Sequence, residues 1–412
     1  MSNMDTIKEL REQFPALGQM AYGKPLVYLD NAATAQKPMS VIELCNRMNS
    51  GLNANVHRGM YMLSEEVTAL YEQARENVRE FINAPERENI IFTSGTTASI
   101  NLVASSWCGK FLKEGDIILI SEDSHHSNIV PWQLAAERAG ASIRVLPVDD
   151  NGQWEFDKFE SLLDERVKFV ALTHIANVLG LVNPVKEAIR IAHLHSIPVL
   201  VDGAQGCVHE NVDVQELDCD FYAFSGHKIY AATGTGILYG KAEILNEMPP
   251  YMGGGDMVGT VTFAKTTHAQ LPLKFEAGTP NFIGAATYTP AIEMIKQMRN
   301  GELAKAVKNE ETAIKGYLER EFASIEGLEV YGKGENKIPL YSFSIEGVHP
   351  LDMAQILDKM GMAFRTGMLC AEPTMARFGV TSMMRISFAP YNTLEEAEAF
   401  VAALRKGLAM LR

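Results

Sequence analysis

A lysine and an aspartate, each at the end of a short apolar run, have the types and spacing that point most directly to chemistry. Lys228 lies three residues after the run Phe221–Ser225, and Asp202 closes the run Val199–Asp202. Proteins hold pyridoxal phosphate (PLP) through a lysine that forms a Schiff base and an acidic residue that pairs with the pyridinium nitrogen. Either residue alone has an ordinary explanation, because a lysine after a strand is usually solvated and an aspartate there often caps a helix. Their combination predicts a PLP site, provided that other residues complete it.

The segment before the predicted helix Thr97–Cys108 offers groups that suit a phosphate. Gly95 allows a close backbone approach, and Thr96 and Thr97 place two hydroxyls at the start of the helix. The free N–H groups and the dipole of a helix N-terminus favour anions. Two residues beside the lysine would complete such a phosphate site: Ser225 and His227. An ordinary capped helix is the alternative explanation.

Two adjacent histidines follow another predicted strand end. The imidazole of His125 could stack on a cofactor ring and move protons near neutral pH, whereas the alternative is a polar loop with a satisfied histidine. His125 and His126 should point apart, and no carboxylate or cysteine lies at ligand spacing from them. We therefore predict no metal site.

A cysteine and an arginine in the C-terminal third could act on a substrate. Cys370 lies in a turn-rich stretch between Gly367 and Pro373, which predicts an exposed loop and an accessible nucleophile. Arg385 could bind a substrate carboxylate through two parallel hydrogen bonds. A packed cysteine and a surface ion pair are the alternatives. The other cysteines are scattered, which indicates that most are buried small side chains rather than parts of a disulfide framework: Cys45, Cys108, Cys207 and Cys219.

Short apolar runs alternate with helical patterns between residues 89 and 240, which predicts an α/β domain with a mostly parallel sheet. In such sheets ligands bind at the carboxyl ends of the strands. The predicted strands are Ile90–Thr93, Ile117–Ser121, Ser142–Pro147, Phe169–Thr173, Val199–Asp202, Phe221–Ser225 and Gly236–Tyr239. The predicted helices are Thr97–Cys108, Ile129–Ala139, Phe156–Leu163 and Pro184–His195.

The remaining segments predict a second, smaller α+β domain. A long helix (Ala291–Phe322) precedes short strands and a last helix that begins with the capping box Thr393–Glu396. The predicted strands are Leu328–Tyr331, Leu340–Ile345, Ala363–Arg365 and Met384–Phe388. An amphipathic helix is expected within residues 1–15, and a bridging or interface loop over residues 251–288.

Composition sets outer limits on function. The 412 residues are 47% hydrophobic and 21% charged, which is ordinary for a globular protein with a sizeable core. The net charge of −14 argues against a nucleic-acid or anionic-membrane surface. No segment reads as a signal peptide or a membrane span, so we expect a cytoplasmic protein.

Motifs spread over nearly the whole chain resemble the class V aminotransferase group of fold-type I PLP enzymes, and within it the group II cysteine desulfurases of the SUF type, close to selenocysteine lyases. These motifs are residues 28–33 (YLDNAA), 55–59 (NVHRG), 95–97 (GTT), 125–132 (HHSNIVPW), 177–180 (NVLG), 202–205 (DGAQ), 225–228 (SGHK), 275–281 (FEAGTPN) and 365–367 (RTG), with Cys370 after them. The resemblance implies a mostly parallel large domain over residues 19–288. It also implies a small α+β domain that combines residues 1–18 with 289–412 and carries the Cys370 loop.

The resemblance implies a role for each cofactor-binding residue. Lys228 would bind the cofactor covalently and shuttle protons, Asp202 would pair with the ring nitrogen, and His125 would stack on the ring. The remaining cofactor contacts would come from Thr96, Thr97, Asn177, Gln205, Ser225 and His227, with Gln205 on the ring oxygen and Thr97, Ser225 and His227 on the phosphate. The family is homodimeric, and Thr279 would reach the phosphate in the neighbouring subunit.

The resemblance also implies the reaction. Arg385 and Asn177 would hold the carboxylate of L-cysteine, with Ala33 and Arg365 also placed at the substrate. Cys370 would take the substrate sulfur as a persulfide, leaving L-alanine, and a small sulfur-acceptor protein would receive it for iron–sulfur cluster assembly. Catalytic residues would therefore be Lys228, Cys370 and His125.

One departure concerns the residues beside this cysteine. Family members usually carry two histidines directly before it, where this chain has Met368 and Leu369, and a glutamine where it has Glu372. An apolar setting and a nearby carboxylate both raise a thiol pKa, which Arg365 would offset in part. Three alternatives therefore stay open: a selenocysteine lyase, another class V lyase or aminotransferase, and a PLP-bound scaffold without turnover.

Overall fold

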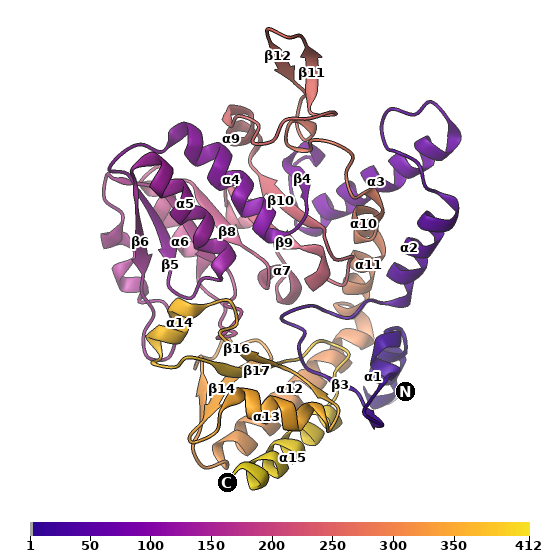
Figure 1. Cartoon of the computed structure of the whole chain (residues 1–412), viewed down its shortest axis with the longest axis vertical. Helices are drawn as coiled ribbons and strands as arrows, with labels where there is room; N and C mark the ends of the chain where they lie inside the picture. Colours follow the sequence, from indigo (N-terminus) through magenta and orange to yellow (C-terminus); the bar gives the residue numbers. More distant parts are fainter. Residues whose placement is uncertain (1–2) are drawn as a thin grey trace.

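The computed structural model describes residues 3–412, and its larger part is built around one seven-stranded sheet (Figure 1). The strand order is β4-β10-β9-β8-β7-β5-β6. Neighbouring strands run parallel except for β10, which is antiparallel to both β4 and β9. The strands are β4 (Ile90–Thr93), β5 (Ile117–Ser121), β6 (Ser142–Leu146), β7 (Val167–Thr173), β8 (Val199–Asp202), β9 (Phe221–Ser225) and β10 (Gly236–Gly240). The predicted mostly parallel α/β sheet is confirmed.

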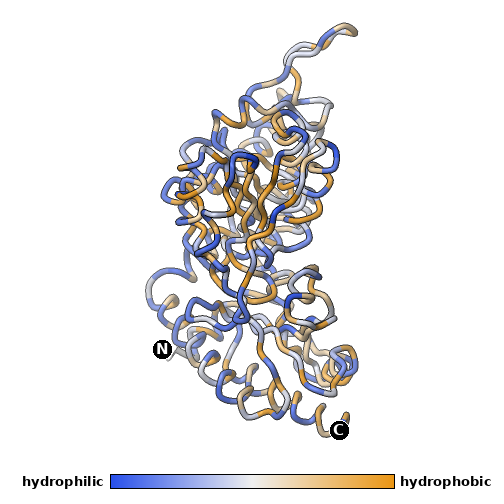
Figure 2. Tube along the Cα trace, turned by 90° about the vertical axis from the view of Figure 1, so that its left-hand side faces the viewer, coloured by the Kyte–Doolittle hydropathy of each residue, from blue (hydrophilic) through white to orange (hydrophobic). Residues whose placement is uncertain are grey.

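Helices bury both faces of this sheet. Successive residues of β7 point to opposite faces: Phe169 packs with α4 (Thr96–Phe111) and α5 (Val130–Ala139), whereas Val170 packs with α6 (Val185–Leu194). Figure 2 shows the apolar residues gathered on these central strands. Because both faces are covered, the inner strands are mainly apolar, and polar side chains stand at their carboxyl ends: Ser121, Thr173, Asp202 and Ser225.

The smaller part lies below the sheet in Figure 1 and contains a four-stranded antiparallel sheet. Its order is β13-β14-β17-β16, with β13 (Leu328–Tyr331), β14 (Leu340–Ile345), β16 (Arg365–Gly367) and β17 (Met383–Ser387). The helices that share its core are α12 (Gly301–Ala323), α13 (Pro350–Asp358) and α15 (Leu394–Leu411). Helix α15 begins with the predicted capping box, in which Thr393 accepts from the backbone N–H of Glu396 and the Glu396 side chain accepts in return.

Two short elements connect the parts. Helix α1 (Asn3–Glu12) buries Ile7 and Leu10, as the amphipathic pattern predicts. Strand β3 (Val27–Tyr28) pairs in parallel with β15 (Met362–Ala363), so Val27 and Leu29 pack in the core of the smaller part, whereas Tyr28 packs against the core of the larger part. The predicted division at residues 19 and 288 stays a prediction.

Three predicted elements were wrong. Residues 156–163 form two 3-10 turns, η4 (Phe156–Lys158) and η5 (Glu160–Leu162), rather than a helix. The apolar spacing of three in this short segment fits a 3-10 turn as well as an α-helix, and the rings of Phe156 and Phe159 stack 5.7 Å apart. The predicted long helix from residue 291 is broken into α11 (Tyr288–Met298) and α12, where Gly301 adopts φ +64°.

The segment predicted as a loop over 251–288 is the third. It holds the hairpin β11 (Val258–Val261) and β12 (Thr266–His268), which projects from the top of the molecule in Figure 1, followed by α10 (Phe282–Ala286). The hairpin contributes no residue to the sheet cores, and Phe263 near its tip is fully exposed. Weak periodicity hid it, because strands that face solvent on both sides lack an apolar alternation.

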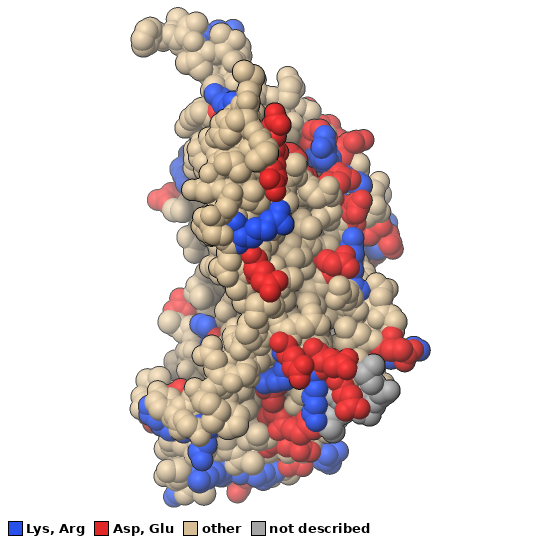
Figure 3. Space-filling model, turned by 90° about the vertical axis from the view of Figure 1, so that its right-hand side faces the viewer, with Lys and Arg blue, Asp and Glu red and all other residues tan. Residues whose placement is uncertain are grey.

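The surface carries charges of both signs. On the face drawn in Figure 3, Lys and Arg side chains lie among Asp and Glu side chains. Surface ion pairs such as Arg405–Glu321 also occur in the structure. Within residues 3–412, no helix is both long enough and apolar enough to pass through a bilayer.

Candidate active site

A cavity of about 400 Å³ opens where the strands of the large sheet end and the smaller part covers them. It lies at the carboxyl ends of parallel strands, the position expected for a ligand in such a sheet. All but one of the predicted site residues line it: Ala33, Thr96, Thr97, His125, Asn177, Asp202, Gln205, Ser225, His227, Lys228, Arg365, Cys370 and Arg385. The cavity therefore joins residues more than 350 positions apart in the sequence.

Lys228 and Asp202 enter this cavity from adjacent strands. Strand β9 ends at Ser225, and the 3-10 turn Gly226–Lys228 places the lysine over the end of β8, which closes with Asp202. Burial lowers the pKa of Lys228 to about 8, although the charge of Asp202 raises it in part. Burial raises the pKa of Asp202, and Lys228 offsets part of that effect. The pair combines an amine that is readily deprotonated with a carboxyl group shielded from water.

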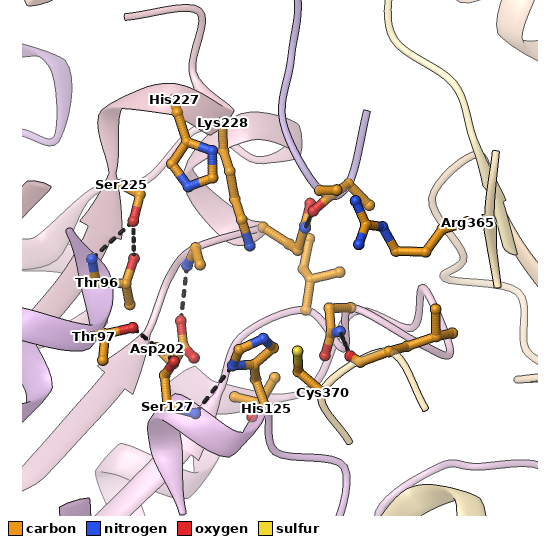
Figure 4. Close-up of a pocket in the computed structure, with 18 of the residues that line it drawn as sticks. Thr96, Thr97, His125, Ser127, Asp202, Ser225, His227, Lys228, Arg365 and Cys370 are labelled. Atoms are coloured by element: carbon orange, nitrogen blue, oxygen red, sulfur yellow. Dashed lines mark hydrogen bonds between the residues drawn. The ribbon is translucent and has the colours of Figure 1, made fainter. Parts of the chain in front are cut away.

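Hydroxyls and a helix N-terminus line one side of the cavity. Ser225 Oγ lies 2.8 Å from the backbone nitrogen of Thr96 and 2.7 Å from its Oγ1, and Thr97 Oγ1 lies 2.7 Å from Ser127 Oγ (Figure 4). Gly95 precedes α4 with φ +154°, and a Cβ on Gly236 would come within 2.3 Å of the Gly95 backbone. The glycines thus let the strand ends approach the start of α4. The free N–H groups at this helix N-terminus suit an anion.

His125 faces the cavity as a neutral imidazole. Its pKa is lowered to about 3 by burial first and then by the charge of Lys228. Its Nδ1 accepts a hydrogen bond of 3.0 Å from the Ser127 backbone N–H, which leaves Nε2 available to the cavity. His227, on the other side, has its pKa lowered to about 4 by burial and by Lys228. Neither imidazole adds positive charge near neutral pH.

Arg385 supplies a buried cation to the lining of the cavity. Only 2% of Arg385 is exposed, and its Nη1 donates to the backbone oxygen of Asn177 at 2.9 Å. Its Nε and the side-chain oxygen of Asn177 have no hydrogen-bond partner among the described residues. Burial lowers the pKa of Arg385 to about 10. A buried guanidinium with an unused donor is suited to receive a carboxylate.

The sequence reasoning missed the role of Asp30. Its carboxylate accepts two bonds from the Arg365 side chain, at 3.0 Å from Nε and 2.8 Å from Nη2, and lies 3.3 Å from Arg385 Nη2. Asp30 lies two residues after the short strand β3, within the motif of residues 28–33, and these were the available signals for its function. It sets the position of both arginines.

Cys370 reaches the cavity on a loop with an unusual backbone. Leu369 and Cys370 both have positive φ, +53° and +54°, a conformation that costs an L-residue roughly 1–2 kcal/mol. The Leu369 carbonyl accepts from Asn177 Nδ2 at 2.9 Å, and the Leu369 side chain is buried in an apolar cluster. Cys370 itself is exposed, as predicted, whereas Cys108, Cys207 and Cys219 are buried. In Figure 4 its sulfur lies beside His125, across the cavity from the Lys228 side chain.

The donor set fits PLP. The cavity has the size of a small-molecule site and offers an amine for an aldehyde, a carboxyl for a ring nitrogen, and hydroxyls with a helix N-terminus for a phosphate. Asn177 and Arg385 line the same cavity, and the unpaired Asn177 oxygen and Arg385 Nε are available to an amino-acid substrate. Residues that sequence reasoning left without a role also line it: Ser127, Thr173, Ile175 and Thr366.

Thr279 is the predicted site residue that the structure does not bring to this cavity. It is exposed and lies in the segment between the hairpin β11–β12 and α10. Its predicted contact is with a second subunit, so its role stays a prediction.

Comparisons with known proteins agree with this architecture. The class-V aminotransferase family matches residues 27–400. A probable cysteine desulfurase of Vibrio cholerae is 46% identical, with 100% of both chains covered. A longer cysteine desulfurase of Synechococcus elongatus is 44% identical over 97% of this chain and 63% of its own length. The crystal structure of a cysteine desulfurase from Escherichia coli superposes with a TM-score of 0.90 at 39% identity, covering 98% of this chain and 99% of that one.

Proposed function

Because the chain belongs to the class-V aminotransferase family, we propose that it is a PLP-dependent cysteine desulfurase that converts L-cysteine to L-alanine. One observation carries this proposal: Lys228, from the large sheet, and Cys370, from the covering loop, line the same cavity. An aminotransferase needs the lysine but has no use for a thiol on a loop that faces it. The neighbouring His125 and Arg385 give the cavity a ring-stacking group and a carboxylate-binding group.

When bound, PLP would act as the electron sink that makes the substrate Cα proton removable. Lys228 would hold its aldehyde and Asp202 its ring nitrogen. His125 would stack on the ring, and Gln205 would contact the ring oxygen. The phosphate would lie against the start of α4, held by Thr96, Thr97, Ser225 and His227. These assignments rest on the shared cavity and the chemistry of each side chain.

The substrate carboxylate would bind Arg385 through its free Nε, with Asn177, whose backbone oxygen accepts from Arg385 Nη1, beside it. Ala33 leaves room beside this subsite, and Arg365, joined to Asp30, adds positive charge at the entrance. With a pKa of about 8, Lys228 can be deprotonated near neutral pH, so it can take a proton from Cα and return it.

Cys370 would accept the substrate sulfur. Its thiolate attacks that sulfur, an S–S bond forms, and the C–S bond breaks with its electron pair remaining on the carbon. Protonation of the carbon completes the methyl group of alanine. Overall, L-cysteine and one Cys370 thiol give L-alanine and one Cys370 persulfide, so no external oxidant is needed. Because Cys370 is exposed, the sulfur can then pass to an acceptor.

Four further assignments concern location, oligomeric state, the sulfur acceptor and the domain boundaries. We infer a cytoplasmic homodimer in which Thr279 reaches the phosphate of the neighbouring subunit. We also infer a small sulfur-acceptor protein that supplies iron–sulfur cluster assembly. Residues 19–288 would act as the large domain, with residues 1–18 and 289–412 as the small domain.

Product analysis of the holoenzyme tests the function. With L-cysteine and dithiothreitol under anaerobic conditions, we expect alanine and sulfide in equal amounts. Pyruvate in place of alanine would indicate another class V reaction, and selenide release from selenocysteine without turnover of cysteine would indicate a selenocysteine lyase. A PLP spectrum that responds to no amino acid would indicate a scaffold.

A further inference from the structure

The second histidine of the adjacent pair has no part in the reaction proposed above, yet it contacts the Cys370 loop twice. The backbone N–H of His126 donates to the Cys370 carbonyl at 2.8 Å. The backbone N–H of Glu372 donates to His126 Nε2 at 3.0 Å. His125 faces the cavity while its neighbour binds the chain on either side of Ala371, with the two ring centroids 6.2 Å apart.

The loop needs such contacts because its backbone is not in a relaxed conformation. Leu369 and Cys370 both adopt positive φ, which few L-residues do without support. Before the cysteine, the chain is held by Asn177 Nδ2 on the Leu369 carbonyl and by the buried Leu369 side chain. After it, helix α14 (Glu372–Arg377) is attached to the large sheet region, where Arg377 Nε donates to Val148 at 3.0 Å. His126 binds the chain between these two anchors, through its contacts with Cys370 and Glu372.

We propose that His126 is a positioning residue whose imidazole keeps Cys370 over the cavity by accepting the Glu372 N–H. An Nε2 that accepts cannot carry a proton, so the working form is the neutral ring with its proton on Nδ1. The Glu372 carboxylate, 3.9 Å from the same nitrogen, is a weaker contact and is exposed. The imidazole bond to Glu372 is thus a side-chain clasp on the Cys370 loop, beside the backbone bond from His126 to the Cys370 carbonyl, and opening it loosens the loop around the thiol.

This inference deepens the proposed function and rests on it: Cys370 must meet the substrate inside the cavity and an acceptor outside it. A clasp made from one hydrogen bond to a half-exposed ring can open at little cost, whereas the buried Leu369 anchor stays in place. His126 therefore affects sulfur uptake by Cys370 and leaves PLP binding and substrate binding unaffected.

The test compares His126→Leu and His126→Gln in the holoenzyme. Leucine fills similar space without an acceptor, whereas the Gln side-chain oxygen can take the place of Nε2. For His126→Leu we expect alanine formation in the first turnover to slow about fivefold to tenfold. The KM for L-cysteine and the PLP spectrum should be unchanged, and amide hydrogen exchange in residues 366–373 should be faster. His126→Gln should recover most of the rate and the protection from exchange.

Two further variants separate the clasp from charge effects. Glu372→Gln removes the carboxylate but keeps the N–H, so both readouts should match the wild type. His195→Leu is a matched control, because His195 also lies 3.9 Å from a glutamate, Glu160, outside the cavity lining. The proposal is overturned if Glu372→Gln acts like His126→Leu, if glutamine gives no rescue, or if exchange is unchanged. Hydrogen exchange needs no turnover, so it tests the clasp even if the wild type makes no alanine.

Discussion

The two sides of the cavity are built in opposite ways. On one side, Lys228 and Asp202 project from neighbouring strands of a sheet that is covered on both faces. On the other, Cys370 lies on an exposed loop with two positive φ angles, held by a few hydrogen bonds and one buried leucine. Groups that must stay at a fixed distance from a cofactor are on the rigid sheet, whereas the group that must reach two places is on a releasable loop.

The largest effect should come from the rigid side. Lys228→Ala removes both the covalent anchor and the proton carrier, so alanine formation should fall by about 10³-fold or more. Lys37→Ala is the matched control, since burial also lowers the pKa of Lys37 to about 8 but it does not line the cavity. Rates of alanine release measure both. A similar loss in the two variants would show that the loss does not depend on the place of Lys228 in the cavity.

Arg385 should come next. Arg385→Lys keeps the charge but loses the planar donors, so kcat/KM for L-cysteine should fall about 10- to 100-fold, mostly through KM. Arg365→Lys should cost less, because 47% of that side chain is exposed and its bonds go to Asp30. Steady-state kinetics separates the two. A larger effect at Arg365 would reverse the assignment of the substrate subsite.

The pH dependence of PLP uptake tests the buried lysine. The neutral amine is the form that reacts with an aldehyde, and the pKa of Lys228 is lowered to about 8 by burial. The rate of PLP capture by the apoprotein should therefore rise about tenfold per pH unit below pH 8 and level off above it. Asp202→Asn should move this midpoint lower, because the Asp202 charge raises that pKa. A rate that keeps rising to pH 10 would contradict the predicted shift.

The smallest effect should come from the loop anchor. Leu369→Ala removes apolar contacts from a side chain that is 6% exposed, so alanine formation should slow only a few-fold. Hydrogen exchange in residues 366–373 should become faster. Met368→Ala is the control, because Met368 is 49% exposed. It should change neither the rate of alanine formation nor hydrogen exchange. Equal effects of the two variants would mean that burial of Leu369 does not hold the loop.

The sequence predicted the rigid side far better than the loop side. All seven predicted strands of the large sheet are present, and each begins or ends where its apolar run does, because buried parallel strands are continuous apolar segments. Their polar end residues therefore identified Asp202 and Ser225 directly. The break at Gly301 was missed because the helical pattern continues across it, although a glycine there is a known stop signal.

The loop side depends on contacts between distant residues. Asp30 binds Arg365 from 335 positions away, and His126 binds Glu372 from 246 positions away. No local propensity reports such pairs, and the role of Leu369 as an apolar anchor appears only once its neighbours are known. The motif residues therefore predicted the chemistry of the site. The residues that position them could be found only from contacts in the folded structure.

The central claim is that Cys370 takes the sulfur. The direct measurement is the mass of the Cys370 peptide after anaerobic reaction of the holoenzyme with one equivalent of L-cysteine and no reductant, together with the alanine released. We predict one added sulfur atom on Cys370 and one alanine per chain, with neither product formed by Cys370→Ala. Undiminished alanine release by Cys370→Ala would contradict the account.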